Sequence, residues 1–416
     1  MRTNLLIFNF FLALTASAQL TMPHEESEHE GTWLQWPHNY TYGFGAEDME
    51  MSWVEMTAAL TSGERVHLIA YAEEEVVHIS NLLEAAGVDM GQVDFQVCPT
   101  DDFWVRDNGP IFAQSGAGEW LILDWGFNGW GGDAPFALDD AVPTAIASNL
   151  NLEVIDLSAM VLEGGAIEID GQGTLMATRS SITGDDRNPG LTEAEIEAYL
   201  SEYIGVEQFI WLDGLYGGTE DITDQHIDGF VKFAGDHTLV TMEDADLNYW
   251  YVSASDRAII DQAVNASGIP YTRVNLPLTQ FPVQTTWGQN VGFRSSYVNY
   301  YVANAVVLVP AYNDPMDAVA LEIIQGLYPD RTAVGINCQN MVLLGGMVHC
   351  VTQQQPMGSG AMSLHAPLPN EEHGACVKLL DLVGREIQNP ADGQLFIKVY
   401  SDGSTEKMIA WSGRWF

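Results

Sequence analysis

The stretch RVHLIAYAEEEVVHISNLLEAAG, residues 65–87, contains the two patterns that decide the fold class. Its first part, RVHLIAY (65–71), is a short apolar run of β-favouring residues and is typical of a strand. Its second part, EEEVVHISNLLEAAG (73–87), spaces apolar residues as on one face of a helix. A strand followed at once by an amphipathic helix indicates an α/β or α+β domain.

The same alternation occurs further along the chain. A second strand-like run, TLMATR (174–179), precedes a second helical pattern, LTEAEIEAYLSEYIG (191–205). Later β-rich runs are GFVKF (229–233), HTLVTME (237–243), SYVNYYV (296–302) and AVVLVP (305–310). No glycine-rich phosphate loop of the Rossmann or Walker type follows any of these strands, so the sequence does not indicate a nucleotide cofactor.

Length and N-terminal pattern predict an exported protein. The chain has 416 residues, 47% of them hydrophobic, which is enough for one large domain and an accessory module. Its start, MRTNLLIFNFFLALTASAQL, has one basic residue, an apolar stretch over 5–14 and the small residues Ala16-Ser17-Ala18. This pattern is typical of a signal peptide and is too short for a membrane span. We expect a signal peptide over 1–18 and a mature chain that begins near Gln19.

The C-terminal region differs in charge from the rest. Residues 377–416 contain five basic and five acidic residues, whereas the whole chain has a formal net charge of −42. We therefore expect a main domain over 19–358, a linker over 359–375 and a β module over 376–416 with a hairpin turn at Asp402-Gly403. LLDLVGREI (379–387) resembles the C-terminal sorting domains of the Bacteroidetes type IX secretion route, and an ordinary terminal hairpin is the alternative. A sorting tail implies the secretion machinery as a partner and a secreted or cell-surface location.

The overall charge excludes some classes of partner. With 57 acidic and 15 basic residues, the protein repels nucleic acid and anionic membrane surfaces and attracts small cations. We take the solubility of an exported protein as the main cause of this charge.

Cysteine usage leaves the role of Cys350 open. Four cysteines in so long a chain are not a disulfide framework, and without a CxxC pair the sequence does not favour structural zinc. At least one thiol is expected to be free. Spacing alone does not tell whether Cys350, in MVLLGGMVHCVTQQQP (341–356), is a buried thiol, half of a disulfide or a nucleophile.

Polar residues collect in three further stretches beside apolar strands: DDFWVRDNGP (101–110), VLEGGAIEIDGQGT (161–174) and DITDQHIDGFVKF (221–233). Burial of such charges is costly without partners. His226 can activate a Cys350 thiolate and serve as general acid, and Glu163 can orient that histidine. Asp107 and Asp228 then match a planar guanidinium, which presents several N–H donors.

Each of these residues also has a structural explanation, which is favoured when it is taken alone. Asp107 fits a turn residue paired to Arg106, His226 a core histidine and Cys350 an inert buried thiol. A metal site is disfavoured, because adjacent His349 and Cys350 on an expected strand point to opposite faces.

Taken together, the motifs resemble one family from about residue 22 to residue 358. The chain is similar to agmatine deiminases and bacterial peptidylarginine deiminases, which modify guanidino groups. The matching segments are MPHEESEHEGTWLQWPHN, FWVRDNGP, DWGFNGWGG, EGGAIEIDGQGT, DRNPGL, HIDGFVKF, SYVNYYVAN with NDPMDAVALEI, and GGMVHCVTQQQP.

The resemblance implies a pentein fold, an α/β propeller of five ββαβ modules with the active site in its central well. It implies Cys350 as nucleophile, His226 as general acid and base, Glu163 as partner of that histidine, and Asp107 and Asp228 as guanidinium clamps. The further residues expected at the substrate are Trp36, Trp104, Trp130 and Asn299. Core packing is an equal alternative for the tryptophans.

The implied activity is hydrolysis of agmatine to N-carbamoylputrescine and ammonia through a covalent cysteine thiouronium intermediate, with no metal, nucleotide or redox cofactor. The alternatives are a peptidylarginine deiminase and a non-catalytic binding protein for guanidino ligands. Two departures bear on the substrate: Gln225 stands where agmatine deiminases usually have glycine, and export is a property of the known bacterial peptidylarginine deiminase. Glu163 and SYVNYYVAN look more like the agmatine enzymes. The resemblance leaves an oligomer open.

Overall fold

The computed structural model describes residues 20–41, 45–215, 221–235, 237–360, 376–381, 385–387, 395–400, 405–411 and 414–415. The chain divides into two compact units, one within Met1–Ser363 and the other within Leu364–Phe416. The expected signal peptide and most of the expected linker, residues 361–375, lie outside the described residues.

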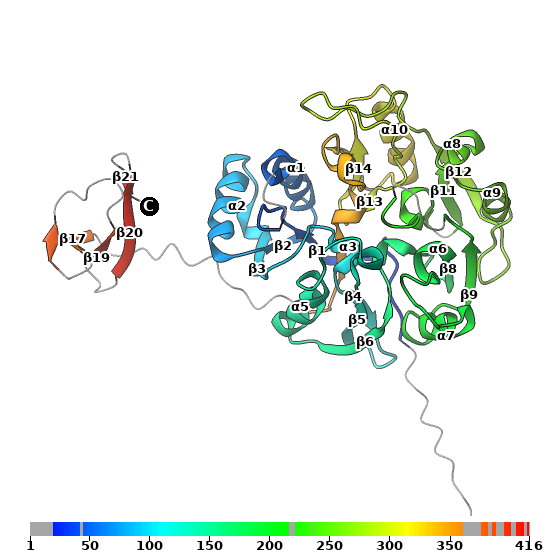
Figure 1. Cartoon of the computed structure of the whole chain (residues 1–416), viewed down its shortest axis with the longest axis horizontal. Coiled ribbons are helices and arrows are strands. Elements are labelled where there is room, and N and C mark those ends of the chain that lie inside the picture. Colours follow the sequence, from blue (N-terminus) through cyan, green and yellow to red (C-terminus); the bar gives the residue numbers. More distant parts are fainter. Residues whose placement is uncertain are drawn as a thin grey trace, which may run out of the picture. The chain divides into compact units, whose positions relative to one another are not determined.

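The larger unit is built from five small mixed sheets, four of them from one ββαβ module each and the other a four-stranded sheet whose fourth strand comes from the end of the unit. In four modules the first strand is antiparallel to the second, and a helical segment leads to a third strand parallel to the second. Figure 1 shows the modules around a central axis, with their strands inside and their helices outside. The expected propeller of five ββαβ modules is confirmed.

The first module comprises β1 (His29–Gln35), η1 (Ala46–Asp48), α1 (Glu50–Leu60), β2 (Arg65–Ala70), α2 (Glu73–Ala85), η2 (Met90–Gln92), β3 (Val93–Val97) and β16 (Gln353–Pro356). The second comprises β4 (Ile111–Gln114), β5 (Trp120–Gly126), α4 (Gly129–Gly132), η3 (Asp139–Ala141), α5 (Val142–Leu150) and β6 (Glu153–Val161). The third comprises β7 (Ile167–Ile169), β8 (Thr174–Thr178), α6 (Arg179–Ile182), α7 (Glu193–Tyr203) and β9 (Gln208–Leu212).

The fourth module comprises β10 (Lys232–Ala234), β11 (Thr238–Met242), α8 (Asp244–Tyr249), α9 (Ala254–Asp261) and β12 (Thr272–Leu276). The fifth comprises β13 (Tyr301–Val302), β14 (Val306–Ala311), α10 (Asp317–Leu327) and β15 (Thr332–Asn337). Short helical turns in the connections are α3 (Val105–Asn108), η4 (Gly164–Ala166), η5 (Ile227–Gly229), η6 (Met341–Leu344) and η7 (His349–Val351).

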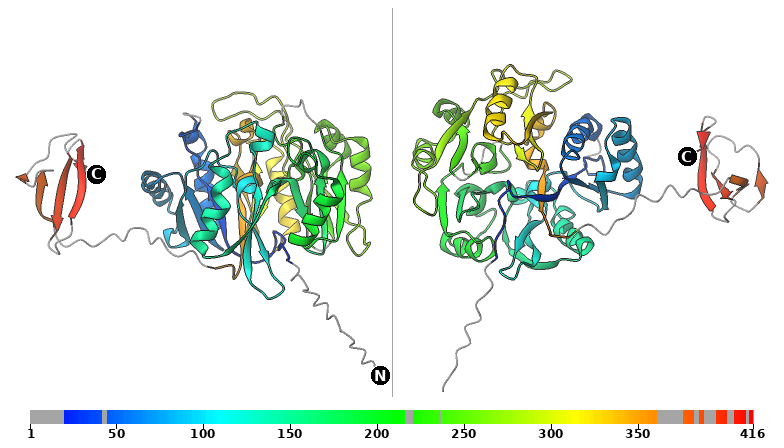
Figure 2. Two further views of the ribbon diagram at one scale, coloured as in Figure 1. Left: turned by 60° about the horizontal axis from the view of Figure 1, so that its bottom comes forward. Right: turned by 180° about the vertical axis from the view of Figure 1, so that it is seen from behind.

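The last strand of the unit closes the ring on the first. β16 pairs antiparallel with β1, with Thr32 opposite Gln354 and Trp33 opposite Gln353, and the indole N–H of Trp33 donates to Gln355 at 3.0 Å. Figure 2 shows these two strands, blue and orange, meeting at the centre of the unit. The glutamine run that follows Cys350 is therefore a strand that joins both ends of the domain.

Local sequence signals agree with the elements. The middle strands β2 and β14 are buried over nearly their whole length, as expected of strands covered on both faces. Helix α7 begins with a capping box, in which the side chains of Thr192 and Glu195 each accept from the other's backbone N–H.

Two expected strands are wrong in extent. In SYVNYYV only Tyr301–Val302 is a strand, because the N–H of Tyr300 donates to the carbonyl of Val298 at 2.8 Å and turns the chain there. In GFVKF the strand begins only at Lys232, because residues 227–229 form η5. Both interruptions occur where the chain approaches the centre of the ring.

The chemistry-bearing residues all follow the third strand of a module. Asp107 lies between β3 and β4, Glu163 between β6 and β7, His226 and Asp228 between β9 and β10, and Cys350 between β15 and β16. Asn299 lies in the remaining connection of this kind, between β12 and β13. Five equivalent connections therefore deliver these residues to one end of the axis.

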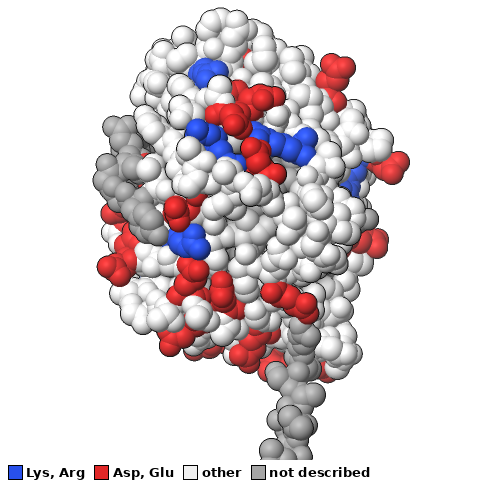
Figure 3. Space-filling view, turned by 90° about the vertical axis from the view of Figure 1, so that its right-hand side faces the viewer, with Lys and Arg blue, Asp and Glu red and all other residues white. Residues whose placement is uncertain are grey.

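Surface arginines of this unit lie beside carboxylates. Arg179 is 2.6 Å from Glu193, and Arg294 is 2.9 Å from Asp246. Figure 3 shows one face of the unit, on which basic side chains lie among acidic ones. Little positive charge on this face is left without an acidic neighbour.

The smaller unit contains one sheet in the order β18-β17-β19-β20-β21. Its strands are β17 (Cys376–Asp381), β18 (Glu386–Ile387), β19 (Leu395–Tyr400), β20 (Thr405–Trp411) and β21 (Arg414–Trp415). Strands β19 and β20 pair antiparallel as expected, while the turn signal Asp402-Gly403 lies outside the described residues. In the described part of the chain, no helix has the length and apolar character needed to cross a bilayer.

Candidate active site

Asp107 lies on α3 and is buried with both carboxylate oxygens hydrogen-bonded. Oδ1 accepts from the backbone N–H of Gly165 at 3.1 Å, and Oδ2 accepts from Nε1 of Trp130 at 3.0 Å. Burial raises the pKa of Asp107 to about 6; the positive charge of His226 opposes this shift, and the negative charge of Asp228 adds to it. Asp107 is therefore mostly ionised at neutral pH and loses its charge in mild acid.

His226 and Glu163 form a buried pair. Nε2 of His226 is 3.1 Å from Oε2 of Glu163, and its Nδ1 is 3.6 Å from Oδ1 of Asp107. The other oxygen of Glu163 accepts from Nε of Arg187 at 2.7 Å, which fixes the carboxylate. Burial alone lowers the pKa of His226, but the charges of Asp107 and Glu163 outweigh it and raise the pKa to about 9. His226 thus carries a proton at neutral pH.

Asp228 lies two residues after His226, in η5, and its Oδ2 is 2.8 Å from Nδ1 of His349. Burial alone raises the pKa of Asp228, but the hydrogen bond and charge of His349 outweigh it and hold the pKa below its ordinary value. Asp228 is therefore anionic near neutrality. The site contains two carboxylates whose environments differ.

Cys350 lies in η7 beside Asp228. Its Sγ is 3.8 Å from Oδ2 of Asp228 and accepts a hydrogen bond from Nδ2 of Asn299 at 3.3 Å. Although Cys350 keeps some exposed surface, the protein packed around it and the charges of Asp228 and Asp107 raise the pKa of the thiol well above its ordinary value. At rest the group is a thiol. Cys98, Cys338 and Cys350 are all free, which confirms the expectation of at least one free thiol.

Gly165 lies where these side chains converge. A Cβ added to it would be 2.7 Å from Oδ1 of Asp107, 2.8 Å from Nδ1 of His226 and 3.1 Å from Oδ2 of Asp228. Three of the expected functional groups therefore surround one point, and the space exists because residue 165 has no side chain. Among the described residues, no hydrogen bond joins His226 directly to Cys350. His226 and Cys350 are therefore not a directly hydrogen-bonded pair. Both face the space beside Gly165.

The three tryptophans differ in position. Trp130 donates to Asp107, as described above, from a left-handed backbone conformation at φ 54°. Trp104 packs against the loop that leads to Cys350. Its ring lies so close to Gly346 that a Cβ on that residue would be 2.2 Å away. Trp36 donates to Glu50 at 2.9 Å within the first module and belongs to the same buried apolar cluster as Trp104 and Trp130.

Asn299 holds the loop that carries Cys350. Besides its bond to Cys350, its Oδ1 accepts from the backbone N–H of His349 at 3.0 Å, and its Nδ2 donates to the carbonyl of Asp228 at 3.3 Å. Asn299 therefore ties two of the site-bearing connections together.

The expectation that His349 and Cys350 lie on a strand is wrong, since both lie in η7. The physical reason is local: the N–H of Thr352 donates to the carbonyl of His349 at 3.2 Å, and β16 starts only at Gln353. In the described part of the chain, no group of three or more His, Cys, Asp and Glu side chains is arranged to hold a metal ion.

Sequence reasoning did not single out Gly165, Arg187 or Glu25. Gly165 lies in the quoted motif EGGAIEIDGQGT, close to the candidate catalytic Glu163, and this position was an available signal. Arg187 lies in the quoted motif DRNPGL, where a charged residue in a loop was a signal of the same kind. Glu25 lies in the quoted motif MPHEESEHEGTWLQWPHN, before β1 and far from the other site residues in the chain.

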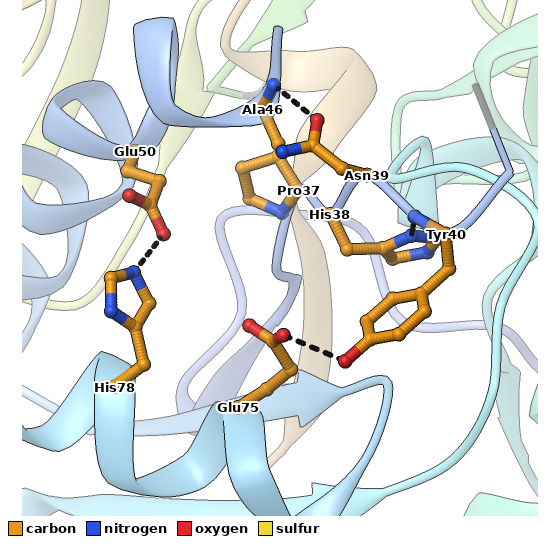
Figure 4. Close-up of a pocket in the computed structure, with 8 residues that line it drawn as sticks. All are labelled: Pro37, His38, Asn39, Tyr40, Ala46, Glu50, Glu75 and His78. Atoms are coloured by element: carbon orange, nitrogen blue, oxygen red, sulfur yellow. Dashed lines mark hydrogen bonds and ion pairs between the residues drawn. The ribbon is translucent and has the colours of Figure 1, made fainter. Parts of the chain in front are cut away.

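A separate hollow of about 470 Å³ lies in the first module (Figure 4). Its polar groups are paired with one another: His78 with Glu50 at 2.7 Å and the hydroxyl of Tyr40 with Glu75 at 3.0 Å. None of the expected catalytic residues lines this hollow. The chemistry-bearing groups therefore point to the space around Gly165 and not to this one.

Comparisons with known proteins agree with this geometry. Residues 21–356 match the profile of the family described as Porphyromonas-type peptidyl-arginine deiminase. An agmatine deiminase from Pseudomonas aeruginosa is 32% identical over 360 residues, which is 80% of this chain and 95% of that protein.

Two solved structures share the fold. One, of a protein from Porphyromonas gingivalis, has a TM-score of 0.72 at 30% identity and covers 82% of this chain and 99% of its own. The other, an agmatine deiminase from Enterococcus faecalis, has a TM-score of 0.71 at 26% identity and covers 81% and 96%. The expected pentein fold is confirmed.

Proposed function

Because the chain belongs to the Porphyromonas-type peptidyl-arginine deiminase family, whose relatives include agmatine deiminases, we propose that it hydrolyses agmatine to N-carbamoylputrescine and ammonia. The protein is a hydrolase of the agmatine deiminase type. The observation that carries the proposal is the convergence of Asp107, His226 and Asp228 on Gly165, with the Cys350 thiol beside Asp228. This arrangement fits a planar cation whose carbon lies within reach of a nucleophile.

A guanidinium placed over Gly165 would meet a carboxylate on two sides. Each carboxylate can accept two N–H bonds from it, and charge-assisted bonds of this kind are stronger than neutral ones. The two clamps fix the plane of the group and hold its carbon within reach of Cys350. Orientation therefore supplies much of the rate.

The surrounding charges favour a substrate whose far end is not anionic. Arg187 is 2.7 Å from Glu163, Arg106 is 3.5 Å from Glu25, and both arginines are almost fully buried. The surface arginines are likewise set among carboxylates (Figure 3). An ammonium tail such as that of agmatine suits this environment better than the α-carboxylate of free arginine.

Substrate binding also prepares the nucleophile. In the empty site, burial and two carboxylates hold Cys350 as a thiol. A guanidinium bound between Asp107 and Asp228 neutralises their charge next to the sulfur, which favours the thiolate. The thiol proton leaves to solvent, because His226 already carries one. Reaction is thus coupled to the presence of a cation.

The thiolate then attacks the guanidinium carbon to give a tetrahedral adduct. Protonated His226 donates its proton to the departing amino group, ammonia leaves, and a thiouronium on Cys350 remains. Neutral His226 next takes a proton from water, the hydroxide adds to the same carbon, and the C–S bond breaks to release the ureido product. Glu163 holds the imidazole through both steps, as the third member of a triad does.

A substrate panel tests the proposal. Ammonia release is measured with agmatine, free arginine and an arginine-containing peptide, with the Cys350→Ala variant as the control for contaminating activity. We expect the highest kcat/KM for agmatine and none in the variant. A preference for free arginine would overturn the assignment of agmatine.

The second candidate is a peptidylarginine deiminase, which the description of the matching family favours. The same panel separates it, because kcat/KM would then be highest for the arginine peptide. Binding of agmatine without ammonia release from any compound would instead indicate a guanidino-binding protein.

We also propose that the protein is exported and that residues 376–416 are a sorting tail. The support is the leader pattern over 1–18, the change in charge at the tail and the separate sheet that the tail forms. Cell fractionation in a host with type IX secretion tests this. We expect the full chain at the surface or in the medium and a tail-deleted chain retained inside the envelope; a full chain retained in the cytoplasm would refute export.

A further inference from the structure

His349 lies between two carboxylates. Its Nδ1 is 2.8 Å from Oδ2 of Asp228, and its Nε2 is 2.7 Å from Oε2 of Glu25. The ring is buried, with a relative exposure of 2%. An ionised carboxylate only accepts hydrogen bonds, so both ring nitrogens must donate when both carboxylates are ionised. In that state His349 is an imidazolium.

Glu25 is held as a carboxylate by its own partners. Oε1 is 3.0 Å from Nζ of Lys232 and accepts from the backbone N–H of Val302 at 2.8 Å, and Oε2 is 3.5 Å from Arg106. Burial alone raises the pKa of Glu25, but the charges of Lys232 and His349 outweigh it and hold the pKa well below its ordinary value.

This chain of contacts joins parts of the molecule that are far apart in sequence. Glu25 precedes β1, Lys232 begins β10, Val302 ends β13 and Arg106 lies on α3. Glu25 and His349 are separated by 324 positions. The N-terminal segment therefore contributes directly to the environment of the guanidinium clamp Asp228.

We propose that His349, kept cationic by Glu25, is a positioning residue that orients Asp228 and keeps it ionised for the substrate cation. This proposal rests on the function proposed above. His349 donates to the same oxygen that lies 3.8 Å from the Cys350 sulfur, so it also fixes which edge of Asp228 faces the nucleophile. Glu25 acts on Asp228 through His349.

Other charged groups around this chain limit what a variant can change. Those around Asp228 are His226, Asp107, Arg106 and Cys350. Those around Glu25 are Lys232, Arg106, Glu168, Tyr300, Tyr301 and Tyr328. Because His226 and Arg106 remain when His349 is replaced, we expect a shift in the titration of Asp228 and not its complete neutralisation.

The first test needs no substrate. Aspartate is labelled with ¹³C at its carboxyl carbon, and the Asp228 resonance is identified by its loss in Asp228→Asn. In His349→Gln the carboxyl of Asp228 should titrate about one pH unit or more above its wild-type midpoint, because a neutral amide replaces the cation. Glu25→Gln should shift it in the same direction by less. An unmoved midpoint in His349→Gln would overturn the proposal.

The second test uses turnover of agmatine. In His349→Gln the acid limb of kcat/KM should become steeper on its low-pH side, because Asp228 then loses its charge closer to the midpoint of about 6 that Asp107 sets. The matched control is His67→Gln on β2, because His67 is also buried and lies 3.4 Å from Asp94 but does not reach the site. It should lower the melting temperature and leave the shape of the profile unchanged. Equal profiles in both variants would reduce His349 to a structural role.

These outcomes separate the two proposals. If wild-type protein releases no ammonia from agmatine, the proposed substrate fails while the titration of Asp228 still decides the role of His349. If agmatine turns over normally and the titration of Asp228 does not move in His349→Gln, the positioning role fails and the activity stands.

Discussion

Replacing Gly165 by alanine changes the site by a single methyl group. Its Cβ would lie 2.7 Å from Oδ1 of Asp107 and 2.8 Å from Nδ1 of His226, whereas an ordinary contact begins near 3.4 Å. The two groups must therefore move apart by about 0.6 to 0.7 Å, or the backbone must shift by a similar amount. The backbone of Gly165 is not left-handed, so alanine adopts it without strain of its own.

A displacement of this size at reacting groups has a known scale. Misplacement by about 1 Å lowers rates up to about a hundredfold, so we expect kcat/KM of Gly165→Ala to fall about ten- to a hundredfold. That corresponds to about 1.4 to 2.7 kcal/mol of lost transition-state stabilisation. The fall comes from steric displacement and not from loss of any functional group.

The assay is ammonia release with agmatine, accompanied by a thermal melt of each variant. The control is Gly326→Ala in α10, where an added Cβ meets no atom within 4 Å. This control should keep wild-type activity and gain about 0.5 to 1 kcal/mol of stability from the better helix propensity of alanine. If Gly165→Ala is folded and keeps kcat/KM within about threefold of wild type, the convergence of groups on residue 165 does not form the substrate site.

Three further predictions concern charge. The kcat/KM of the wild type should rise through pH about 6 as Asp107 becomes ionised and fall above pH about 9 as His226 loses its proton, and a flat profile over this range would exclude these two roles. In Glu163→Gln the basic limb should move down by about one to two pH units, because the imidazolium loses a carboxylate at 3.1 Å; an unmoved limb would show that Glu163 does not support it. In Asp107→Asn kcat/KM should fall more than about a hundredfold, roughly 3 kcal/mol or more, and a folded variant with near-wild-type turnover would show that Asp107 is no clamp.

Sequence patterns were sufficient for the regular elements. The hydrophobic periods correctly predict two strands and one helix, namely the strands Arg65–Ala70 and Thr174–Thr178 and the helix Glu73–Ala85. Each segment is long enough for its own pattern of apolar residues to determine which side is buried. The region around SYVNYYV was misjudged because Tyr297, Val298 and Tyr300 are fully buried although the segment is not a strand. An apolar run in a buried connection cannot be distinguished from a strand by composition.

Part of the candidate site could likewise be predicted from the sequence and part could not. The motifs supplied the identities of Asp107, Glu163, His226, Asp228 and Cys350, since residue type and order along the chain carry them. They did not supply the contacts between connections, because those depend on how the five modules close into a ring. The bond between Asp228 and His349 spans 121 positions and could be found only in the folded structure.

The most direct test of the account is the chemical state of Cys350 during turnover. Protein mixed with agmatine is quenched in acid at successive times, digested, and the Cys350 peptide is weighed by mass spectrometry. The account predicts an adduct with the mass of agmatine less one ammonia, present during turnover and absent once substrate is exhausted. Release of ammonia at the full rate with an unmodified Cys350 peptide at every time would contradict it.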